Sequence, residues 1–138
     1  MTGLSLLDTN VLVYAYDPIE PLKQKIAQEL VKGALRGQFI ISAQVLAEFT
    51  STLLHKVAVR RTADEISALL DILAPIKVIA PDAVMVRRAV EAHAAYGIHF
   101  YDGLIVAAAE RAGCERIWSE DLNPRQKYFG VVVANPFH

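Results

Sequence analysis

Polar side chains follow a short apolar segment near the beginning of this 138-residue chain. Residues 4–7 predict a buried strand, and Asp8, Thr9 and Asn10 follow it as a turn. In open α/β sheets, ligands and chemistry gather beyond the carboxyl ends of the strands, so Asp8 is a candidate working carboxylate. The ordinary alternative is that these three residues only form a turn or cap the next helix.

A second predicted strand, residues 116–118, is also followed by acids. Asp121 stands beyond its carboxyl end as Asp8 does beyond the first strand, and Glu120 competes with Asp121 for this role. Asp102 opens a predicted helix, where the helix dipole and free backbone N–H groups favour a negative charge. The alternatives are a plain helix cap for Asp102 and a surface loop acid for Asp121.

Glu48 is the fourth candidate acid, on a helix predicted over residues 43–57. It borders the apolar stripe of that helix, although a single helical glutamate is most often simply solvated. Asp8, Asp102 and Asp121 are expected to project from one edge of the sheet. Glu48 is expected within a turn or two of the same edge, so the four acids form one candidate site.

Four carboxylates in one place repel each other. Two unit charges ~4 Å apart cost about 4 kcal/mol at an effective dielectric of 20. Protons or a cation must relieve this repulsion, and near neutral pH Mg²⁺ or Mn²⁺ with oxygen ligands is the natural solution. Such a cation lowers the pKa of a bound water and polarises a phosphoryl oxygen. Thr9, Asn10 and Ser119 are expected to orient ligands and waters around it.

Strands alternating with helices must position these acids. The strands are predicted at residues 4–7, 39–41, 76–80, 116–118 and 131–134. The helices are predicted at residues 21–36 and 43–57, from Thr62 to Pro75, from Pro81 to Gly97, and from Asp102 to Gly113. This alternation predicts a three-layer α/β/α sandwich around a mainly parallel, five-stranded sheet. Residues 123–130 predict a mobile loop, and the last strand is expected near an edge of the sheet.

Apolar periodicity predicts which helix faces are buried. For the helix over residues 21–36, the predicted inward positions are Leu22, Ile26, Leu30 and Leu35. For the helix that begins at Pro81, they are Ala83, Val86, Val90 and Ala94. The segment 104–109 is apolar all round, so the helix that contains it should be deeply buried.

The composition indicates one globular domain over residues 1–138, with 54% apolar and 21% charged residues. No run is long and apolar enough to cross a bilayer, and no signal peptide is recognisable. The single Cys114 cannot form an internal disulfide, so we expect a cytoplasmic protein. The net charge of −1 gives no support for nucleic-acid binding.

Local basic groups nevertheless offer contacts to phosphates. The candidates for RNA binding are Lys56, Arg60, Arg61, Arg125 and Lys127. Each alone is more often a solvated surface residue than a binding group. The chain lacks a glycine-rich dinucleotide motif and a phosphate-loop lysine, which argues against binding of dinucleotides and nucleoside triphosphates.

Four motifs in this order resemble the signatures of PIN-domain ribonucleases. They are Asp8-Thr9-Asn10, Ala47-Glu48, the segment 101–109 and the segment 119–122. The resemblance covers essentially the whole chain. The chain length and the closing Asn135-Pro136-Phe137 look most like the VapC-type toxins of bacterial and archaeal toxin–antitoxin pairs.

The resemblance implies a PIN-like fold and a metal-dependent endoribonuclease that uses Mg²⁺ or Mn²⁺. It implies an acidic pocket of Asp8, Glu48, Asp102 and Asp121, supported by Thr9, Asn10 and Ser119. In that pocket, Asp8, Asp102 and Asp121 are the expected metal ligands, and Glu48 acts through water. Asp121 fits the family spacing better than Glu120. The implied partners are an RNA substrate, a cognate antitoxin whose tail occupies the pocket region, and a second copy of the chain in a homodimer.

Two other functions compete with this interpretation. An aspartyl phosphatase would use Asp8 as its nucleophile, but Asn10 stands where the haloacid-dehalogenase pattern usually has a second Asp. A catalytically inert PIN-like module would bind RNA or a protein without cutting, although the presence of all four acids argues against it. Trapping of a phospho-enzyme tests the first alternative, and an RNA cleavage assay with Mn²⁺ tests the second.

Overall fold

The computed structural model describes residues 3–138, apart from the side chain of Val57. Its strands are β1 (Ser5–Leu7), β2 (Phe39–Ser42), β3 (Val78–Ile79), β4 (Arg116–Trp118), β5 (Lys127–Tyr128) and β6 (Val131–Ala134). Its helices are α1 (Thr9–Ala15), α2 (Pro21–Leu35), α3 (Ala43–His55), α4 (Ala63–Leu73), α5 (Ala83–Tyr96) and α6 (Phe100–Arg111), with a 3₁₀ turn, η1 (Val57–Val59), after α3.

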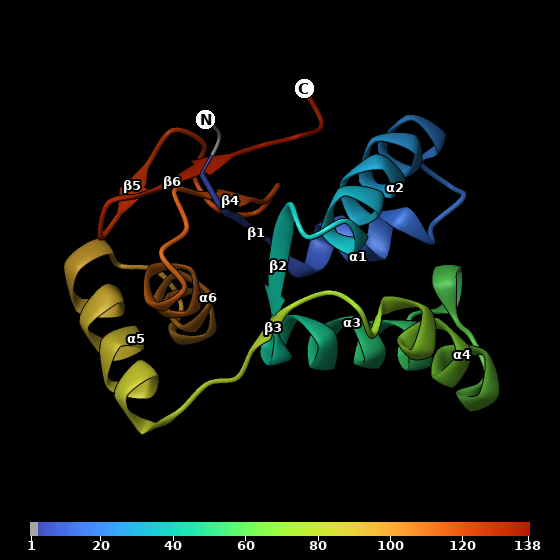
Figure 1. Ribbon diagram of the computed structural model, residues 1–138, viewed down its shortest axis with the longest axis horizontal. Coiled ribbons are helices and arrows are strands. Elements are labelled where there is room, and N and C mark those ends of the chain that lie inside the picture. Colours follow the sequence, from blue (N-terminus) through green and yellow to red (C-terminus); the bar gives the residue numbers. More distant parts are fainter. Residues whose placement is uncertain (1–2) are drawn as a thin grey trace.

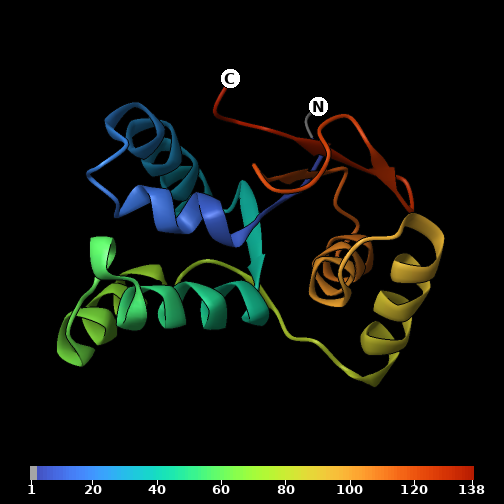
Figure 2. The same ribbon diagram turned by 180° about the vertical axis from the view of Figure 1, so that it is seen from behind.

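The strands form one sheet in the order β3-β2-β1-β4-β6-β5. All neighbouring pairs are parallel except β5 with β6. Helices α1 to α4 gather around the half of the sheet that contains β1 and β2, whereas α5 and α6 lie side by side near β4 and β6 (Figures 1 and 2). The predicted α/β fold with a mainly parallel central sheet is therefore confirmed.

Central strands β1 and β4 carry the candidate site. They pair in register, with Leu7 opposite Trp118, so the residues that follow each strand emerge at the same edge. Leu6, Leu7 and Ile117 are fully buried, as expected for the middle of a sheet with helices on its faces. The packing of these strands fixes the relative positions of the chemistry-bearing turns.

The sheet has six strands, one more than the sequence predicts. The additional strand, β5, lies in the segment 123–130 that was predicted to be a loop. It is only two residues long and pairs antiparallel with β6, so it carries no periodic signal. Its Tyr128 is 2% exposed and packs edge-on against Tyr96 of α5. Strand β6 is second from the edge, close to the predicted position.

The predicted inward face of α2 is only partly right, because Leu30 and Leu35 pack against the edge of the core but Leu22 does not. Leu22 is 80% exposed, and Ile26, Leu30 and Leu35 are only half-buried. The buried positions are Ala27, Val31, Gly33 and Ala34. Small residues permit close approach of the helix to its neighbours, since a Cβ on Gly33 would lie 2.6 Å from the ring of Phe39, and the longer Leu30 and Leu35 pack at the margin of this contact.

The predicted inward face of α5 is wrong. Val86 and Val90 are 43% and 53% exposed, and the buried positions are Met85, Ala89 and Ala92. The reason is the close contact between α5 and α6: a Cβ placed on Gly103 would lie 2.6 Å from the carbonyl oxygen of Ala89. Only small residues fit at this crossing.

The other predicted helix features agree better with the structure. Thr62 and Glu65 form the predicted capping box at the start of α4. Helix α6 is buried on all sides from Gly103 to Ala109, as its apolar sequence predicts. Within residues 3–138, no helix is both long and apolar enough to cross a membrane.

Candidate active site

Asp8 lies at the point where β1 ends and α1 begins, and it is only 6% exposed. Its Oδ1 accepts a hydrogen bond from the backbone N–H of Thr9 (2.8 Å), so Asp8 is the N-cap of α1. Its Oδ2 accepts a hydrogen bond from the hydroxyl of Ser119 (2.7 Å) on the neighbouring strand end. The ordinary interpretation of Asp8 as a helix cap is therefore correct, and it does not exclude a second role.

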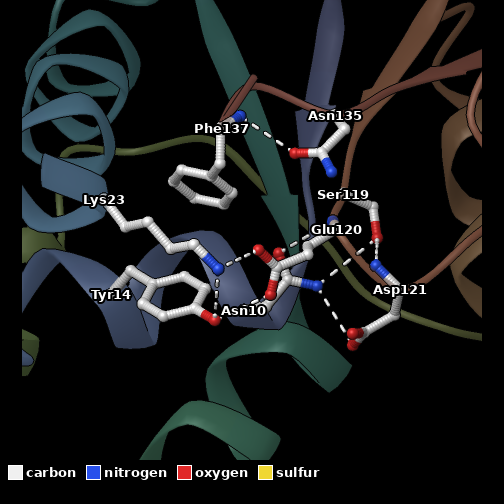
Figure 3. A network of polar contacts seen from close by, with 8 residues as sticks. All are labelled: Asn10, Tyr14, Lys23, Ser119, Glu120, Asp121, Asn135 and Phe137. Carbon is white, nitrogen blue, oxygen red and sulfur yellow. Dashed lines mark hydrogen bonds and ion pairs between the residues drawn. The ribbon is translucent and has the colours of Figure 1, made fainter. Parts of the chain in front are cut away.

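Ser119 organises the turn that follows β4. Its hydroxyl oxygen, fully buried, accepts hydrogen bonds from the backbone N–H of Asp121 (3.1 Å) and of Leu122 (3.4 Å). The Nδ2 of Asn10 bridges Ser119 Oγ (3.4 Å) and Asp121 Oδ2 (3.1 Å), and its Oδ1 accepts from the backbone N–H of Glu120 (3.2 Å) (Figure 3). Asn10 and Ser119 thus hold Asp121 beside the buried Asp8.

Glu48 approaches the same region from α3. Its Oε1 accepts hydrogen bonds from the hydroxyl of Thr9 (3.0 Å) and from Nε2 of Gln44 (3.3 Å). Gln44 Nε2 also donates to the backbone carbonyl of Tyr101 at the start of α6 (3.0 Å). Gln44 therefore joins α3 to α6 and orients Glu48. It was not predicted, although its place four residues before Glu48 on one helix face was a usable signal.

Asp102 lies in the first turn of α6, at the N-terminal end of the helix as predicted, and the alternative that it is a plain helix cap is wrong. The cap is His99, whose Nδ1 accepts from the backbone N–H of Tyr101 (3.2 Å). Partial burial raises the pKa of Asp102, and the negative charges of Asp121 and Glu48 raise it further, while His99 opposes them. Asp102 thus lies within electrostatic range of two other predicted acids.

Asp8 is coupled to the same group of charges. Burial is the largest cause that raises its pKa from 3.8 to about 6, and the carboxylates of Asp121 and Asp102 add to it. The hydrogen bonds from Ser119 and Thr9 act in the opposite direction. The four predicted acids, from four separate segments, therefore form a single electrostatic group.

A solvent-open hollow of ≈320 Å³ lies over this group. Glu48 and Asp121 line it, together with Thr9 and Asn10. Asp8 and Asp102 are not part of its lining, in keeping with the burial of Asp8 below the surface. The site thus has exposed acids at the hollow and more enclosed acids next to them.

Cations do not compensate these acids. In the part of the chain that the structure describes, none of Asp8, Glu48, Asp102 and Asp121 takes part in an ion pair. By contrast, the acids near the hollow of ≈380 Å³ between α5 and α6 are paired with arginines, as in the Arg88–Glu110 pair (2.8 Å). The site has an unbalanced negative charge and oxygen donors, which suits a hard divalent cation.

The side chains are not arranged as a closed metal cage. Among residues 3–138, no three Asp, Glu, His or Cys groups are close enough to hold an ion by themselves. Mg²⁺ usually takes one or two carboxylates directly and keeps several waters, so it does not require such a cage. The Oε1 of Gln44 is buried and lacks a hydrogen-bond partner, which leaves one further oxygen acceptor beside Glu48. The donor set therefore fits a hydrated magnesium ion.

Glu120 and Asp121 have different environments, and this difference distinguishes the two acids, which the sequence treated as competitors for one place in the site. The carboxylate of Glu120 accepts hydrogen bonds from Tyr14 Oη (2.7 Å) and from Lys23 Nζ (2.6 Å), on the side of the turn away from Ser119 (Figure 3). Burial raises the pKa of Glu120, but these two contacts outweigh it and hold the pKa below its usual value. Of the two acids, only Asp121 is free of a cation.

The predicted basic residues are scattered. Lys56 lines the hollow with Glu48 and Asp121. Arg60 is exposed, whereas the guanidinium of Arg61 donates to the backbone carbonyls of Val59 (2.9 Å) and Tyr16 (3.0 Å). Arg125 lines another hollow, along β6, and Lys127 is exposed on β5. Lys56 is thus the predicted cation that the fold brings to the acids.

The fold and the site together define a class of α/β protein. Two of its acids, Asp8 and Asp121, follow central parallel strands at their carboxyl ends, and two more, Glu48 and Asp102, are supplied by helices α3 and α6. A family model described as PIN domain matches residues 5–130, which include all four acids. The chain belongs to the PIN domain family.

Several solved structures have the same fold. FitAcB from Neisseria gonorrhoeae is 22% identical, with a TM-score of 0.66, and the match covers 97% of this chain and 99% of that chain. VapBC2 from Rickettsia felis, bound to a DNA fragment from its promoter, is 19% identical with a TM-score of 0.67, and the match covers 96% of this chain and 98% of that chain.

A third structure is VapC20 from Mycobacterium tuberculosis, described as a toxin that cleaves the sarcin-ricin loop. It is 16% identical with a TM-score of 0.66, over 85% of this chain and 89% of that chain. These identities are low, so the likeness establishes the fold alone. A search of curated proteins found no match.

Proposed function

We propose that this PIN-domain protein is a metal-dependent endoribonuclease and the toxin of a toxin–antitoxin pair. The observation that carries the proposal is the group of four acids without cationic partners, centred on the buried Asp8 with its pKa of about 6. A structural acid at such a place would normally be paired or exposed. Burial of the unpaired Asp8 carboxylate costs free energy, so we infer that a bound cation balances its charge in the functional protein.

In the proposed site, Asp8, Asp102 and Asp121 would hold Mg²⁺ or Mn²⁺, one or two of them directly and the rest through the waters that such an ion keeps, and Glu48 would act through water. When bound, the cation lowers the pKa of a coordinated water and stabilises negative charge on a phosphoryl oxygen. The reaction would form a bond from the water oxygen to phosphorus and break the bond from phosphorus to the leaving nucleoside oxygen, which takes up a proton from solvent in exchange for the proton that the attacking water releases.

The surrounding polar residues fix the acids before the substrate arrives. Ser119 donates to Asp8 (2.7 Å) and orients one of its oxygens. Asn10 orients Asp121 through its Nδ2 (3.1 Å). Thr9 orients Glu48 through its hydroxyl (3.0 Å). Such fixed contacts reduce the reorganisation needed in the transition state.

Several basic residues are proposed to contact the RNA. Lys56 is the strongest candidate because it lines the same hollow as Glu48 and Asp121. Arg60, Arg125 and Lys127 are exposed and remain candidates for contacts farther along the strand. Arg61 is a weaker candidate because its guanidinium is already bonded to two carbonyls.

The proposed partners follow from the neighbouring structures. VapBC2 from Rickettsia felis and a FitAB structure are each described as bound to a DNA fragment, and a Klebsiella pneumoniae neighbour is described as a toxin–antitoxin complex. By analogy, we propose a cognate antitoxin, a homodimer and a cytoplasmic location for this protein. Co-expression with candidate antitoxins and size-exclusion chromatography test the first two.

An RNA cleavage assay tests the activity. The purified chain is incubated with mixed RNA in Mg²⁺, in Mn²⁺ and in EDTA. We expect internal cleavage with either metal, loss of cleavage in EDTA, and loss in Asp8→Asn. Asp71→Asn, which changes an exposed acid on α4, is the matched control and should cut like the parent. Cleavage that persists in EDTA or in Asp8→Asn contradicts the proposal.

An inert PIN-like module remains the second candidate. The observation that favours it is that, within residues 3–138, no three ligand groups form a closed metal cluster. Under this alternative, the chain would retain RNA in a binding assay yet leave it intact in Mn²⁺. The aspartyl phosphatase is disfavoured, because both carboxylate oxygens of Asp8 accept hydrogen bonds and the side chain is 6% exposed.

A further inference from the structure

A second cluster lies on the outer side of the turn that carries Asp121. We call Tyr14, Lys23 and Glu120 the Lys23 cluster. Lys23 Nζ lies 2.6 Å from Glu120 Oε2 and 3.3 Å from Tyr14 Oη, and Tyr14 Oη lies 2.7 Å from Glu120 Oε1. The three groups thus form a closed triangle of hydrogen bonds that joins α1, α2 and the end of β4 (Figure 3).

The turn after β4 is therefore held from two sides. On the inner side, Ser119 contacts Asp8, and the backbone N–H of Glu120 donates to Asn10 Oδ1 (3.2 Å). On the outer side, the side chain of Glu120 is bonded to Lys23 and Tyr14. Residues 119 and 120 immediately precede Asp121, so their backbone conformation determines where the Asp121 side chain points. The inner contacts also hold Asp121 itself, through Asn10 Nδ2 (3.1 Å) and Ser119 Oγ (3.1 Å), so loss of the outer contacts is expected to loosen the turn rather than to free it.

The carboxyl-terminal motif packs over the same cluster. The ring of Phe137 contacts the ring of Tyr14 edge-on, with 4.9 Å between centroids. Lys23 Nζ lies 4.9 Å from the Tyr14 ring centroid and 5.8 Å from that of Phe137. Asn135 Oδ1 accepts from the backbone N–H of Phe137 (2.9 Å) and so closes the turn that presents the ring. The two rings partly shield the ion pair from water, which strengthens it.

We propose that Lys23 and Glu120 are positioning residues, which act with Tyr14 and Phe137 to hold Asp121 toward Asp8 in the candidate metal pocket. The part that concerns metal rests on the function proposed above. The cluster holds the turn whether or not the protein cuts RNA. It also gives a role to Glu120, which the acidic pocket does not use, and to the Asn135-Pro136-Phe137 ending.

The sign of one effect separates positioning from simple electrostatics. Lys23→Gln removes a positive charge near the acids, so electrostatics alone predicts tighter binding of a cation. Positioning predicts the opposite, because the loosened turn holds Asp121 less firmly in place. Glu120→Gln weakens cation binding under both accounts, so Lys23→Gln is the decisive variant.

Two measurements on the whole chain test the proposal. The first is hydrogen exchange, by NMR without metal, at the backbone N–H groups of residues 120–122. The second is binding of Mn²⁺ by titration calorimetry. In Lys23→Gln we expect exchange about twofold to fivefold faster and Mn²⁺ binding weaker by about the same factor, the range for a partly exposed ion pair. Lys23→Arg keeps the positive charge, so it should restore most of the slow exchange and most of the Mn²⁺ affinity of the parent.

Lys25→Gln is the matched control, because it removes an exposed lysine from the same helix. It should leave exchange in the turn unchanged. Tyr14→Phe, which removes only a hydroxyl, gives a milder second variant and should show a smaller change in the same direction. If Lys23→Gln and Tyr14→Phe exchange like the parent, or if Lys23→Gln binds Mn²⁺ more tightly, the proposal is overturned.

Failure of this proposal is distinguishable from failure of the proposed nuclease function. A parent that does not cut RNA, together with faster exchange in Lys23→Gln, leaves the positioning role standing and removes the nuclease. If the parent cuts RNA and Lys23→Gln shows unchanged exchange, the nuclease function stands and the positioning role of Lys23 is removed.

Discussion

Replacement of Asp8 by Asn should stabilise the metal-free protein at neutral pH, although it removes a proposed metal ligand. Burial is the main reason that the pKa of Asp8 rises from 3.8 to about 6. Because one pKa unit corresponds to about 1.4 kcal/mol, a shift of about 2 units destabilises the ionised folded state by about 3 kcal/mol. Asn removes the charge but disturbs one hydrogen bond, at about 1 kcal/mol. The expected net gain is about 2 kcal/mol.

The effect has a defined pH window. Below pH 3.8, Asp8 is protonated in both the folded and the unfolded chain, so burial carries no charge penalty. Between 3.8 and about 6 the folded protein keeps a proton that the unfolded chain has released, so the free energy of unfolding of the parent falls as the pH rises. Above about 6 the penalty is complete. Asp8→Asn should therefore be no more stable than the parent near pH 4, where the lost hydrogen bond outweighs the small charge penalty, and should show its full advantage near pH 7.5.

Urea denaturation in EDTA at the two pH values measures this difference, and Asp71→Asn serves as the control. Mg²⁺ should then reverse the order at neutral pH. At 100 times its Kd, a cation that binds only the folded parent stabilises it by about 2.7 kcal/mol, and Asp8→Asn should gain little. An Asp8→Asn variant that is less stable than the parent in EDTA at neutral pH would refute the assigned cost of burying this carboxylate.

Three further predictions concern other parts of the molecule. Asp102→Asn should abolish RNA cleavage with an unchanged circular dichroism spectrum; cleavage at the parent's rate would remove Asp102 from the site. Lys56→Gln should reduce the salt dependence of RNA binding by roughly 0.7 log unit per log unit, as for one lost phosphate contact on a single strand. An unchanged slope would count against that contact. Gly103→Ala should lower the free energy of unfolding by about 1 to 3 kcal/mol, because the added methyl would meet the Ala89 carbonyl oxygen. Thermal unfolding checks this, and a wild-type melting temperature would mean that the crossing of α5 and α6 can relax.

The sequence predicted the alternation of strands and helices, and with it the sheet that carries the site. Asp8 and Asp121 each follow a short apolar strand, and parallel strands in one sheet present their carboxyl ends at one edge. The strand signals at β1 and β4 are therefore enough to bring these two acids together. The resemblance of the four motifs to PIN domains supplied the family, which the match over residues 5–130 confirms.

Local patterns failed where helices pack closely. Periodicity assigned Val86 and Val90 of α5 to the core, yet Ala89 and Ala92 lie there instead. The hydrophobicity of a residue gives no information on the distance between its helix and the neighbouring helix. Where α5 and α6 cross, Gly103 and Ala89 lie so close together that a larger side chain would clash. Strand β5 was missed because two residues carry no period, and its pairing depends on β6 already being in place.

The sequence by itself determined which residue types could do chemistry and which strand ends would carry them. Tertiary structure decided how neighbouring acids differ: Glu120 faces Lys23 and Tyr14, while Asp121 faces Asn10 and the other carboxylates. It also supplied Gln44 as the support of Glu48, and it raised the pKa of Asp8 through burial. The physical reason is that side-chain direction, burial and charge coupling depend on elements distant in the chain, whereas strand and turn preferences are local.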